Sequence, residues 1–122
     1  MSATDELLTI GETVQTYFEG MHHGDVGRLR AVVHSDALVA GYYQGTYTRQ
    51  SLTEWMTEVE GLDKPAESGE AFDMRIVSID ISARVAMVKV AVLYLGLRFT
   101  DYLTLAKITE QWSIVHKAYV HD

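Results

Sequence analysis

The apolar positions divide the chain into a helical first half and a strand-rich second half. Near the N-terminus, apolar residues recur three and four positions apart, which predicts an amphipathic helix. These positions are Leu7, Ile10, Val14, Tyr17, Phe18 and Met21. Ser2 and Asp5 form a capping-box pattern at the start of this helix, and Asp25 is a natural N-cap for a short second helix.

A short strand, a turn and a third helix are predicted next. Residues 37–40 are apolar and precede Gly41 and Gly45, which predicts a strand leading into a turn. Thr48 is suited to cap the third helix. The inward positions of that helix would be Leu52, Trp55, Met56 and Val59. Residues 61–69 hold the only proline and predict a surface loop between two halves of a single domain, residues 1–122.

The second half predicts four strands, over residues 71–82, 84–96, 97–108 and 112–121. The gaps between them are short, which indicates antiparallel hairpins, and the last hairpin would have a three-residue turn. From position 85 to position 95 both faces of the strand are apolar, interrupted only by Lys89. A sheet with one face in water would alternate instead. Because helices in so short a chain can cover only one face, we expect a homodimer joined through the outer sheet face.

Several short segments carry a family resemblance. They are residues 17–20 (Tyr-Phe-Glu-Gly), Gly24-Asp25, Leu29-Arg30, residues 34–37 (His-Ser-Asp-Ala), residues 99–105 (Phe-Thr-Asp-Tyr-Leu-Thr-Leu) and residues 112–117 (Trp-Ser-Ile-Val-His-Lys). With the order of elements, they resemble the nuclear transport factor two-like (NTF2-like, or SnoaL-like) superfamily, and in particular its putative lumazine-binding family. The resemblance implies an α+β, cone-shaped fold, with a curved antiparallel sheet wrapped around N-terminal helices and enclosing a pocket. It also implies isomerase, cyclase or dehydratase chemistry, or no reaction.

Composition and charge narrow the classes of partner. Ten Lys and Arg residues against seventeen Asp and Glu give a net charge of −7, which argues against binding nucleic acid or an anionic membrane. The chain has no Cys, and its five His residues show no metal-ligand spacing, so we expect neither a metal nor another cofactor. No apolar run is long enough to span a bilayer. The acidic start lacks a signal-peptide pattern, and we expect a cytoplasmic protein.

The last hairpin holds the candidate chemistry. A three-residue turn at 109–111 would place Asp101 opposite Tyr119, with Lys117 diagonal to Asp101 on the same face. The full inward set would be Phe99, Asp101, Leu103, Leu105, Val115, Lys117 and Tyr119. The outer set would be Tyr102, Thr104, Ala106, Ile114, His116 and Ala118. An acid, a base and a phenol among apolar residues predict a ligand pocket, although a two-residue turn would mix the two sets.

Each candidate residue has a functional and a structural interpretation. Asp101 is either a general base or ligand-binding group, or the partner of Lys117 in an ion pair. Tyr17 either donates to a ligand or is a core tyrosine, and His34 either carries protons or complements a helix C-terminus. Trp55 either stacks on a planar ligand or packs in the core. The remaining predicted ligand contacts are Phe99, Leu103 and Tyr119.

Three functions are compatible with these observations. The leading hypothesis is a protein that binds a small organic molecule in a mostly apolar pocket. The first alternative is a cofactor-independent acid-base enzyme of the isomerase, cyclase or dehydratase type, with Asp101 as base and Tyr17 or His34 as its partner. The second alternative is a structural dimerisation or accessory domain. The number of polar side chains that converge in the pocket distinguishes the enzyme from the other two.

Overall fold

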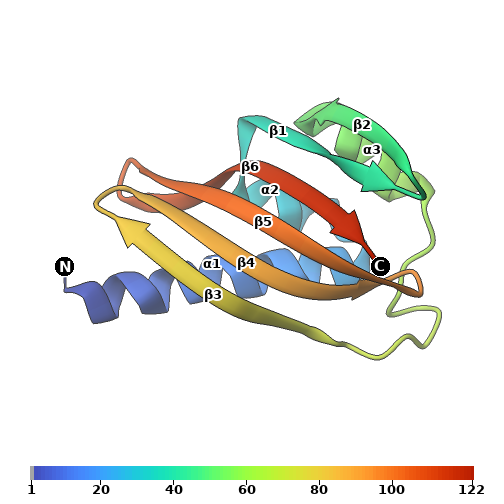
Figure 1. Ribbon diagram of the computed structural model, residues 1–122, viewed down its shortest axis with the longest axis horizontal. Coiled ribbons are helices and arrows are strands. Elements are labelled where there is room, and N and C mark those ends of the chain that lie inside the picture. Colours follow the sequence, from blue (N-terminus) through green and yellow to red (C-terminus); the bar gives the residue numbers. More distant parts are fainter. Residues whose placement is uncertain (1) are drawn as a thin grey trace.

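The computed structural model of the protein describes residues 2–122, which form three helices and six strands (Figure 1). In chain order they are α1 (Ala3–His23), α2 (Val26–Val32), β1 (Val33–Tyr43), β2 (Thr46–Ser51), α3 (Leu52–Gly61), β3 (Met74–Ser82), β4 (Val85–Tyr94), β5 (Leu97–Ile108) and β6 (Gln111–His121). The strands form one sheet in the order β2-β1-β6-β5-β4-β3. The predicted α+β class is confirmed, and the sheet is mixed because β1 and β6 pair in parallel.

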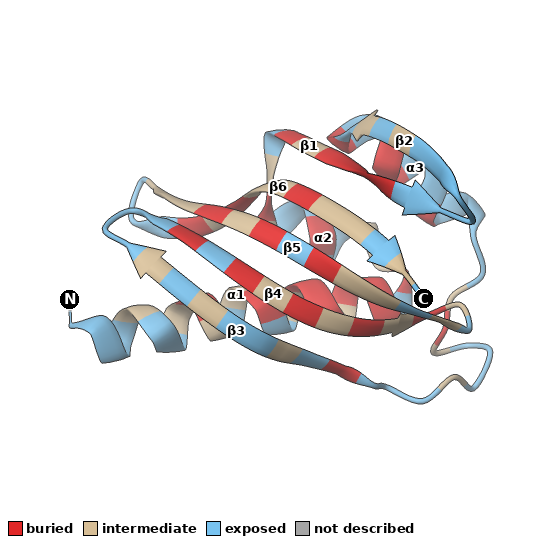
Figure 2. Cartoon of the chain, viewed as in Figure 1, coloured by how far each residue is buried: buried red, intermediate tan, exposed pale blue. Residues whose placement is uncertain are grey.

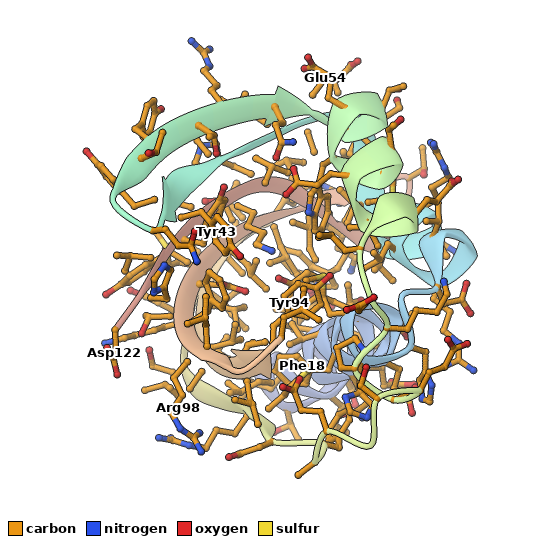
Figure 3. All side chains as sticks on the ribbon, turned by 90° about the vertical axis from the view of Figure 1, so that its right-hand side faces the viewer. Phe18, Tyr43, Glu54, Tyr94, Arg98 and Asp122 are labelled. Atoms are coloured by element: carbon orange, nitrogen blue, oxygen red, sulfur yellow. The ribbon has the colours of Figure 1, made fainter. Side chains whose placement is uncertain are left out.

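The sheet curves around the interior, and the helices close the remaining side. Figure 3 looks along this interior from one end, with the sheet curling past α1 and with α3 opposite. Buried residues come from both halves of the chain and form one hydrophobic core. The fold is therefore a curved, unclosed sheet whose concave face is covered by α1, α2 and α3.

The predicted helix starts are confirmed at two positions. The Ser2 side chain accepts the backbone N–H of Asp5, and the Asp5 carboxylate accepts the backbone N–H of Ser2, which completes the capping box. Asp25 caps α2 by accepting the backbone N–H of Arg28. Gly24, at φ +58°, ends α1 in the left-handed conformation that glycine adopts without strain.

The segment between α2 and α3 differs from the prediction. Thr48 does not cap a helix: it lies in β2, opposite Gly41 of β1. The α3 helix begins at Leu52, and Ser51 is its N-cap in a capping box with Glu54. Because β2 pairs with β1 through a two-residue turn, the strand pairing continues to Ser51 and delays the helix by one turn.

The β5–β6 turn also differs from the prediction, yet the register at Asp101 is right. Thr109 and Glu110 both have positive φ and form a two-residue turn, so Ile108 pairs with Gln111. Between the Leu105–Ile114 pair and the Thr104–His116 pair, β6 contains one extra residue, Val115. This β-bulge restores the predicted pairing of Asp101 with Tyr119.

The bulge changes which residues of β6 face inward. Ile114 was predicted on the outer face, but it lies in the core with 1% of its surface exposed. Val115 was predicted to face inward, and it is the unpaired residue of the bulge and only partly buried. As a result both Ile114 and Lys117, three positions apart, are buried.

The two faces of the sheet differ clearly in burial. Along β4 the even-numbered residues from Ala86 to Tyr94 are buried, whereas Val85 and Met87 on the other face are exposed (Figure 2). The outer face thus keeps large apolar side chains in solvent in this chain. None of the helices in residues 2–122 is long and apolar enough to cross a membrane.

Candidate functional site

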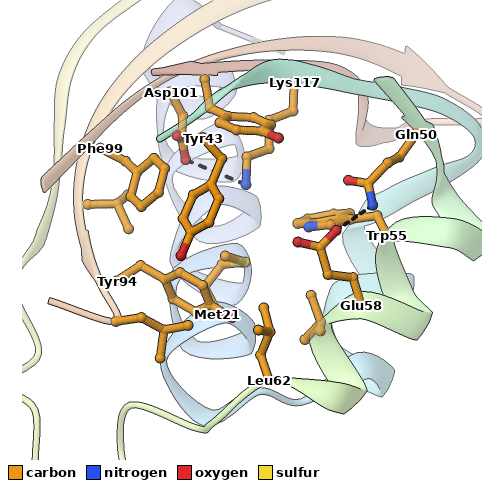
Figure 4. A pocket seen from close by; sticks show the side chains of 14 residues that line it. Met21, Tyr43, Gln50, Trp55, Glu58, Leu62, Tyr94, Phe99, Asp101 and Lys117 are labelled. Atoms are coloured by element: carbon orange, nitrogen blue, oxygen red, sulfur yellow. Dashed lines mark hydrogen bonds and ion pairs between the residues drawn. The ribbon is translucent and has the colours of Figure 1, made fainter. Parts of the chain in front are cut away.

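A pocket opens at the wide end of the curved sheet, between β4–β6, β2 and α3 (Figures 3 and 4). The narrower end is filled by core residues such as Leu105 and Ile114, so the hollow occupies only part of the concave side. Its volume is about 90 Å³. The residues that line it are Met21, Tyr43, Gln50, Trp55, Glu58, Val59, Leu62, Val92, Tyr94, Leu95, Phe99, Asp101, Lys117 and Tyr119.

Five of the predicted site residues lie in the pocket wall, and three do not. Those in the wall are Trp55, Phe99, Asp101, Lys117 and Tyr119. Leu103 is fully buried in the core, and Tyr17 is fully buried behind the pocket wall. His34 lies outside the wall, and its Nδ1 accepts the backbone N–H of Asp36 at 3.1 Å. The ligand roles of all eight residues stay predictions.

Four polar wall residues were not predicted from the sequence: Tyr43, Gln50, Glu58 and Tyr94. Tyr43 lies on a strand, where side chains alternate between the two faces, and that alternation was the one available signal for it. Gln50 and Glu58 hydrogen bond to each other across β2 and α3. Gln50 was missed because the residues after the Thr48 cap were expected in the helix rather than in β2. Glu58 was missed because only apolar positions of that helix were predicted to face inward.

The Asp101 carboxylate is buried and only partly satisfied. Its side chain is 2% exposed, and Oδ2 accepts a 2.6 Å hydrogen bond from the Tyr17 hydroxyl. Lys117 Nζ lies 3.9 Å from the same oxygen, which is too far for a hydrogen bond. Oδ1 is buried without a hydrogen-bond partner among the described residues. One oxygen of a buried carboxylate is therefore left for a group that enters the pocket.

Tyr17 holds Asp101 in place from behind the pocket wall. Burial raises the pKa of Tyr17 well above 10, and the negative charge of Asp101 raises it further. The hydroxyl consequently keeps its proton and remains the donor to Oδ2 at any ordinary pH. This places Tyr17 as a positioning residue for the carboxylate.

Lys117 lies on the pocket wall in an aromatic surrounding. Its Nζ is 4.6 Å from the ring centre of Trp55, 5.2 Å from that of Tyr17 and 5.5 Å from that of Tyr119. Burial lowers the pKa of Lys117, and the nearby charges of Asp101 and Glu58 oppose this shift. Asp101 and Lys117 thus form a loose pair, with both charged groups facing the pocket (Figure 4).

The mouth of the pocket is aromatic. The Tyr43 and Phe99 rings are nearly parallel, with centroids 6.5 Å apart, and Phe99 also contacts Tyr94 and Tyr119 edge-on. The Tyr94 hydroxyl is buried without a hydrogen-bond partner in the described part of the chain. Burial raises the pKa of Tyr94 to about 12, with smaller contributions from Glu58, Glu70 and Tyr43. Tyr94 is therefore a second polar group available inside the pocket.

Tyr119 is positioned by a glycine on the neighbouring strand. Gly41 of β1 pairs with Tyr119, and a Cβ at Gly41 would lie 2.7 Å from Cγ of the Tyr119 ring. Only glycine permits this close approach. The Tyr119 hydroxyl then shares a 2.7 Å hydrogen bond with Thr48 of β2. The ring is fixed at both ends as part of the pocket wall.

The arrangement offers hydrogen bonding and proton transfer inside apolar walls. Asp101 supplies an acceptor, and Lys117 and Tyr94 supply donors. Within residues 2–122 no three or more His, Asp or Glu side chains are grouped to hold a metal ion.

Comparisons with known proteins agree with the fold. An NTF2-like protein of unknown function from Shewanella baltica is 26% identical, with a TM-score of 0.89 over 100% of this chain and 98% of that one. NTF2-like proteins of unknown function from Silicibacter pomeroyi and Methylobacillus flagellatus are each 24% identical, with TM-scores of 0.85 and 0.83. These matches cover 100% of this chain and 100% and 95% of theirs. No curated protein matches the chain.

The family comparison is more specific. The sequence model of the family described as putative lumazine-binding matches residues 5–120. This match spans nearly the whole chain, and it includes both the first helix and the hairpin that carries Asp101 and Lys117. The resemblance seen in the sequence is confirmed, and the protein belongs to the putative lumazine-binding family of NTF2-like proteins.

Proposed function

We propose that the pocket binds a small, largely apolar organic molecule that donates a hydrogen bond to Asp101. Membership in this family supports a ligand-binding domain in general. The observation that carries the finer proposal is the buried Asp101 Oδ1, which has no hydrogen-bond partner in residues 2–122. Leaving such a group unpaired costs about 1–3 kcal/mol, and an N–H or O–H of a ligand would recover this energy.

The size of the pocket limits the ligand. An apolar cavity of roughly 150 Å³ accommodates benzene. The hollow here is smaller, at about 90 Å³, but it is open at the aromatic mouth formed by Tyr43 and Phe99. A ligand would place its polar edge against Asp101 and Lys117 and extend a ring or chain between these aromatic side chains.

A thermal-shift screen of small ring compounds tests this proposal. A compound present at 100 times its dissociation constant would stabilise the wild type by about 2.7 kcal/mol. We expect Asp101→Asn to lose most of that shift, whereas Asp80→Asn, at an exposed position, keeps it. Wild-type protein that no donor-bearing ring compound stabilises, or an undiminished shift in Asp101→Asn, would contradict the proposal.

Acid-base catalysis is a second candidate function. Asp101 Oδ1 and the Tyr94 hydroxyl, at two residues that line the same pocket, have no hydrogen-bond partner among the described residues, so the carboxylate oxygen is available to take a proton. A base and a donor in one apolar site are the minimum for an isomerase-type reaction. We expect a bound ketone to exchange its α-hydrogens with D₂O in the wild type and not in Asp101→Asn, as followed by NMR. Equal exchange in the two proteins would leave binding as the sole function.

We also propose that two copies of the chain associate through the outer sheet face. Val85, Met87 and Tyr102, on adjacent strands of this face, are 42–52% exposed, and so is Val120 of β6 at 46%. Contiguous apolar patches of this kind mark interaction sites. The face carries Arg75, Lys89 and Arg98 against Asp80, and Arg98 forms a 2.9 Å ion pair with Asp73, so the face lacks the acidic excess of the chain as a whole. Its small net charge gives little repulsion between two copies, which supports a second copy as the partner.

A further inference from the structure

Lys117 differs from the other three lysines in its surroundings. It is buried, with 6% of its surface exposed, and its Nζ faces three aromatic rings. The nearest carboxylate oxygen, on Asp101, is 3.9 Å away. By contrast, Lys64 donates a 3.1 Å hydrogen bond to the carbonyl of Gly24, and Lys107 forms a 3.0 Å ion pair with Glu6. Within residues 2–122 the Lys117 amine is therefore held in the pocket without a tight hydrogen-bonded partner.

Burial of Lys117 favours its neutral amine. Removal from water disfavours a charged ammonium that has no oxygen acceptor at hydrogen-bond distance among the described residues, although cation–π contacts with the rings of Trp55, Tyr17 and Tyr119 partly offset this effect. Burial lowers the pKa of Lys117 despite the opposing charges of Asp101 and Glu58. At a given pH, a larger fraction of Lys117 thus carries a free lone pair than of an exposed lysine.

We propose that Lys117 forms a reversible imine with a small apolar aldehyde or ketone bound in the pocket. This inference rests on the proposed function, since the carbonyl compound must first enter the site. The geometry supports it because the amine, an open carboxylate oxygen and an unpaired phenol line one apolar pocket. A desolvated lysine in such a pocket is an established way to make an amine nucleophilic.

The reaction balances without an oxidant or reductant. The Nζ lone pair forms a bond to the carbonyl carbon, and the Asp101 carboxylate carries one N–H proton to the carbonyl oxygen, which gives a carbinolamine. The carboxylate then carries the second N–H proton to the carbinolamine hydroxyl. The C–O bond breaks to release water, and the nitrogen lone pair forms the C=N bond of the neutral imine. One amine and one carbonyl compound thus yield one imine and one water molecule.

Trapping by reduction tests the proposal. The intact protein is incubated with butanal or benzaldehyde at neutral pH in the presence of cyanoborohydride, and the labelled lysines are identified by peptide mass spectrometry. We expect Lys117 to be labelled about tenfold faster than Lys64, Lys89 and Lys107, because among the four lysines only Lys117 lines the pocket that holds the carbonyl compound beside its amine. Lys89 is the closest comparison, because its Nζ also lies over a ring, 5.6 Å from Tyr102, but on the outer face.

The controls separate this inference from the binding proposal. Lys117→Met should remove the fast adduct, and Lys89→Met should retain it. If Lys117→Met fails to fold, the wild-type peptide map alone still compares all four lysines. Labelling of Lys117 no faster than the surface lysines, in protein that ring compounds still stabilise, would overturn the imine and leave binding intact. Absence of both the adduct and any ligand-induced stabilisation would overturn both.

Discussion

The Asp101 carboxylate has one oxygen fixed and the other open. Tyr17 donates to Oδ2 from the first helix, while Oδ1 is buried without a partner in the described chain, at a residue that lines the pocket. A hydrogen bond to a charged group contributes about 1.5–3 kcal/mol to stability. The carboxylate is thus oriented by a tyrosine that lies behind the pocket wall.

Replacing Tyr17 by Phe tests this positioning role. We expect Tyr17→Phe to lower the free energy of unfolding by about 2 kcal/mol, because the buried carboxylate loses its only hydrogen-bond donor among the described residues. Tyr47→Phe, at a 56% exposed tyrosine on β2, should change it by less than about 0.5 kcal/mol. Urea denaturation of both variants gives these values. Equal effects would show that the Tyr17 hydroxyl does not support Asp101.

The raised pKa of Tyr94 predicts that the stability of the protein depends on pH above pH 10. Below pH 10 this tyrosine is protonated in both the folded and the unfolded chain. From pH 10 to about 12 the unfolded chain loses the proton while the folded chain keeps it, so stability falls as the pH rises. We expect wild type to lose about 1–2 kcal/mol more than Tyr94→Phe over this range, less than the full two-unit shift implies because solvent at the mouth screens part of it.

Denaturation at a series of pH values measures this difference. Tyr47→Phe serves as the control, since the Tyr47 ring is exposed and the stability of this variant should fall with rising pH as that of wild type does. If the free energy of unfolding falls equally with rising pH in wild type and in Tyr94→Phe, the Tyr94 hydroxyl is not buried as described.

At the scale of the elements, the bulge in β6 determines which residues reach the interior. It places Ile114 in the core and leaves Val115 unpaired. We expect Ile114→Ala to cost about 2–5 kcal/mol of stability and Val115→Ala less than about 1 kcal/mol. Chemical denaturation of the two variants decides between this arrangement and a regular β6. Without the bulge, the larger loss would fall on Val115.

The same hairpin shows which features of the site the sequence pattern could predict and which it could not. Alternation along β5 was sufficient to place Asp101 inward, because its neighbours Leu103 and Leu105 are apolar on the same face. The predicted turn length, three residues instead of two, was wrong because Thr109 and Glu110 are not residues that favour the positive φ of a two-residue turn. Register at Asp101 was nevertheless right because the bulge adds the residue that the shorter turn removes. Bulges of this kind leave no clear trace in a hydrophobic pattern.

The pocket mouth was harder to predict for a related reason. Tyr94 and Phe99 are far closer in sequence to each other than to Tyr43, and only the curvature of the sheet brings the three rings together. Strand curvature depends on long-range pairing such as the parallel contact of β1 with β6. Asp101 and Lys117, in contrast, share one hairpin and could be paired from local pattern alone.

At the scale of the whole molecule, the exposed outer face predicts self-association. We expect the wild type to sediment as a dimer at micromolar concentration and Met87→Glu with Tyr102→Glu to sediment as a single chain of 13.7 kDa. A charge placed in the centre of an apolar interface is strongly unfavourable. Tyr47→Glu, at an exposed tyrosine on β2 away from these strands, is the matched control and should remain dimeric. Wild type that sediments at 13.7 kDa would contradict the proposal.

The central claim is that the pocket receives a ligand whose donor pairs with Asp101. The most direct measurement is a crystal structure of the protein with the ring compound that stabilises it most. The account predicts that compound in the pocket, with an N–H or O–H about 3 Å from Asp101 Oδ1 and its ring at the Tyr43–Phe99 mouth. A compound bound elsewhere, or one in the pocket whose polar groups all avoid Oδ1, would contradict it.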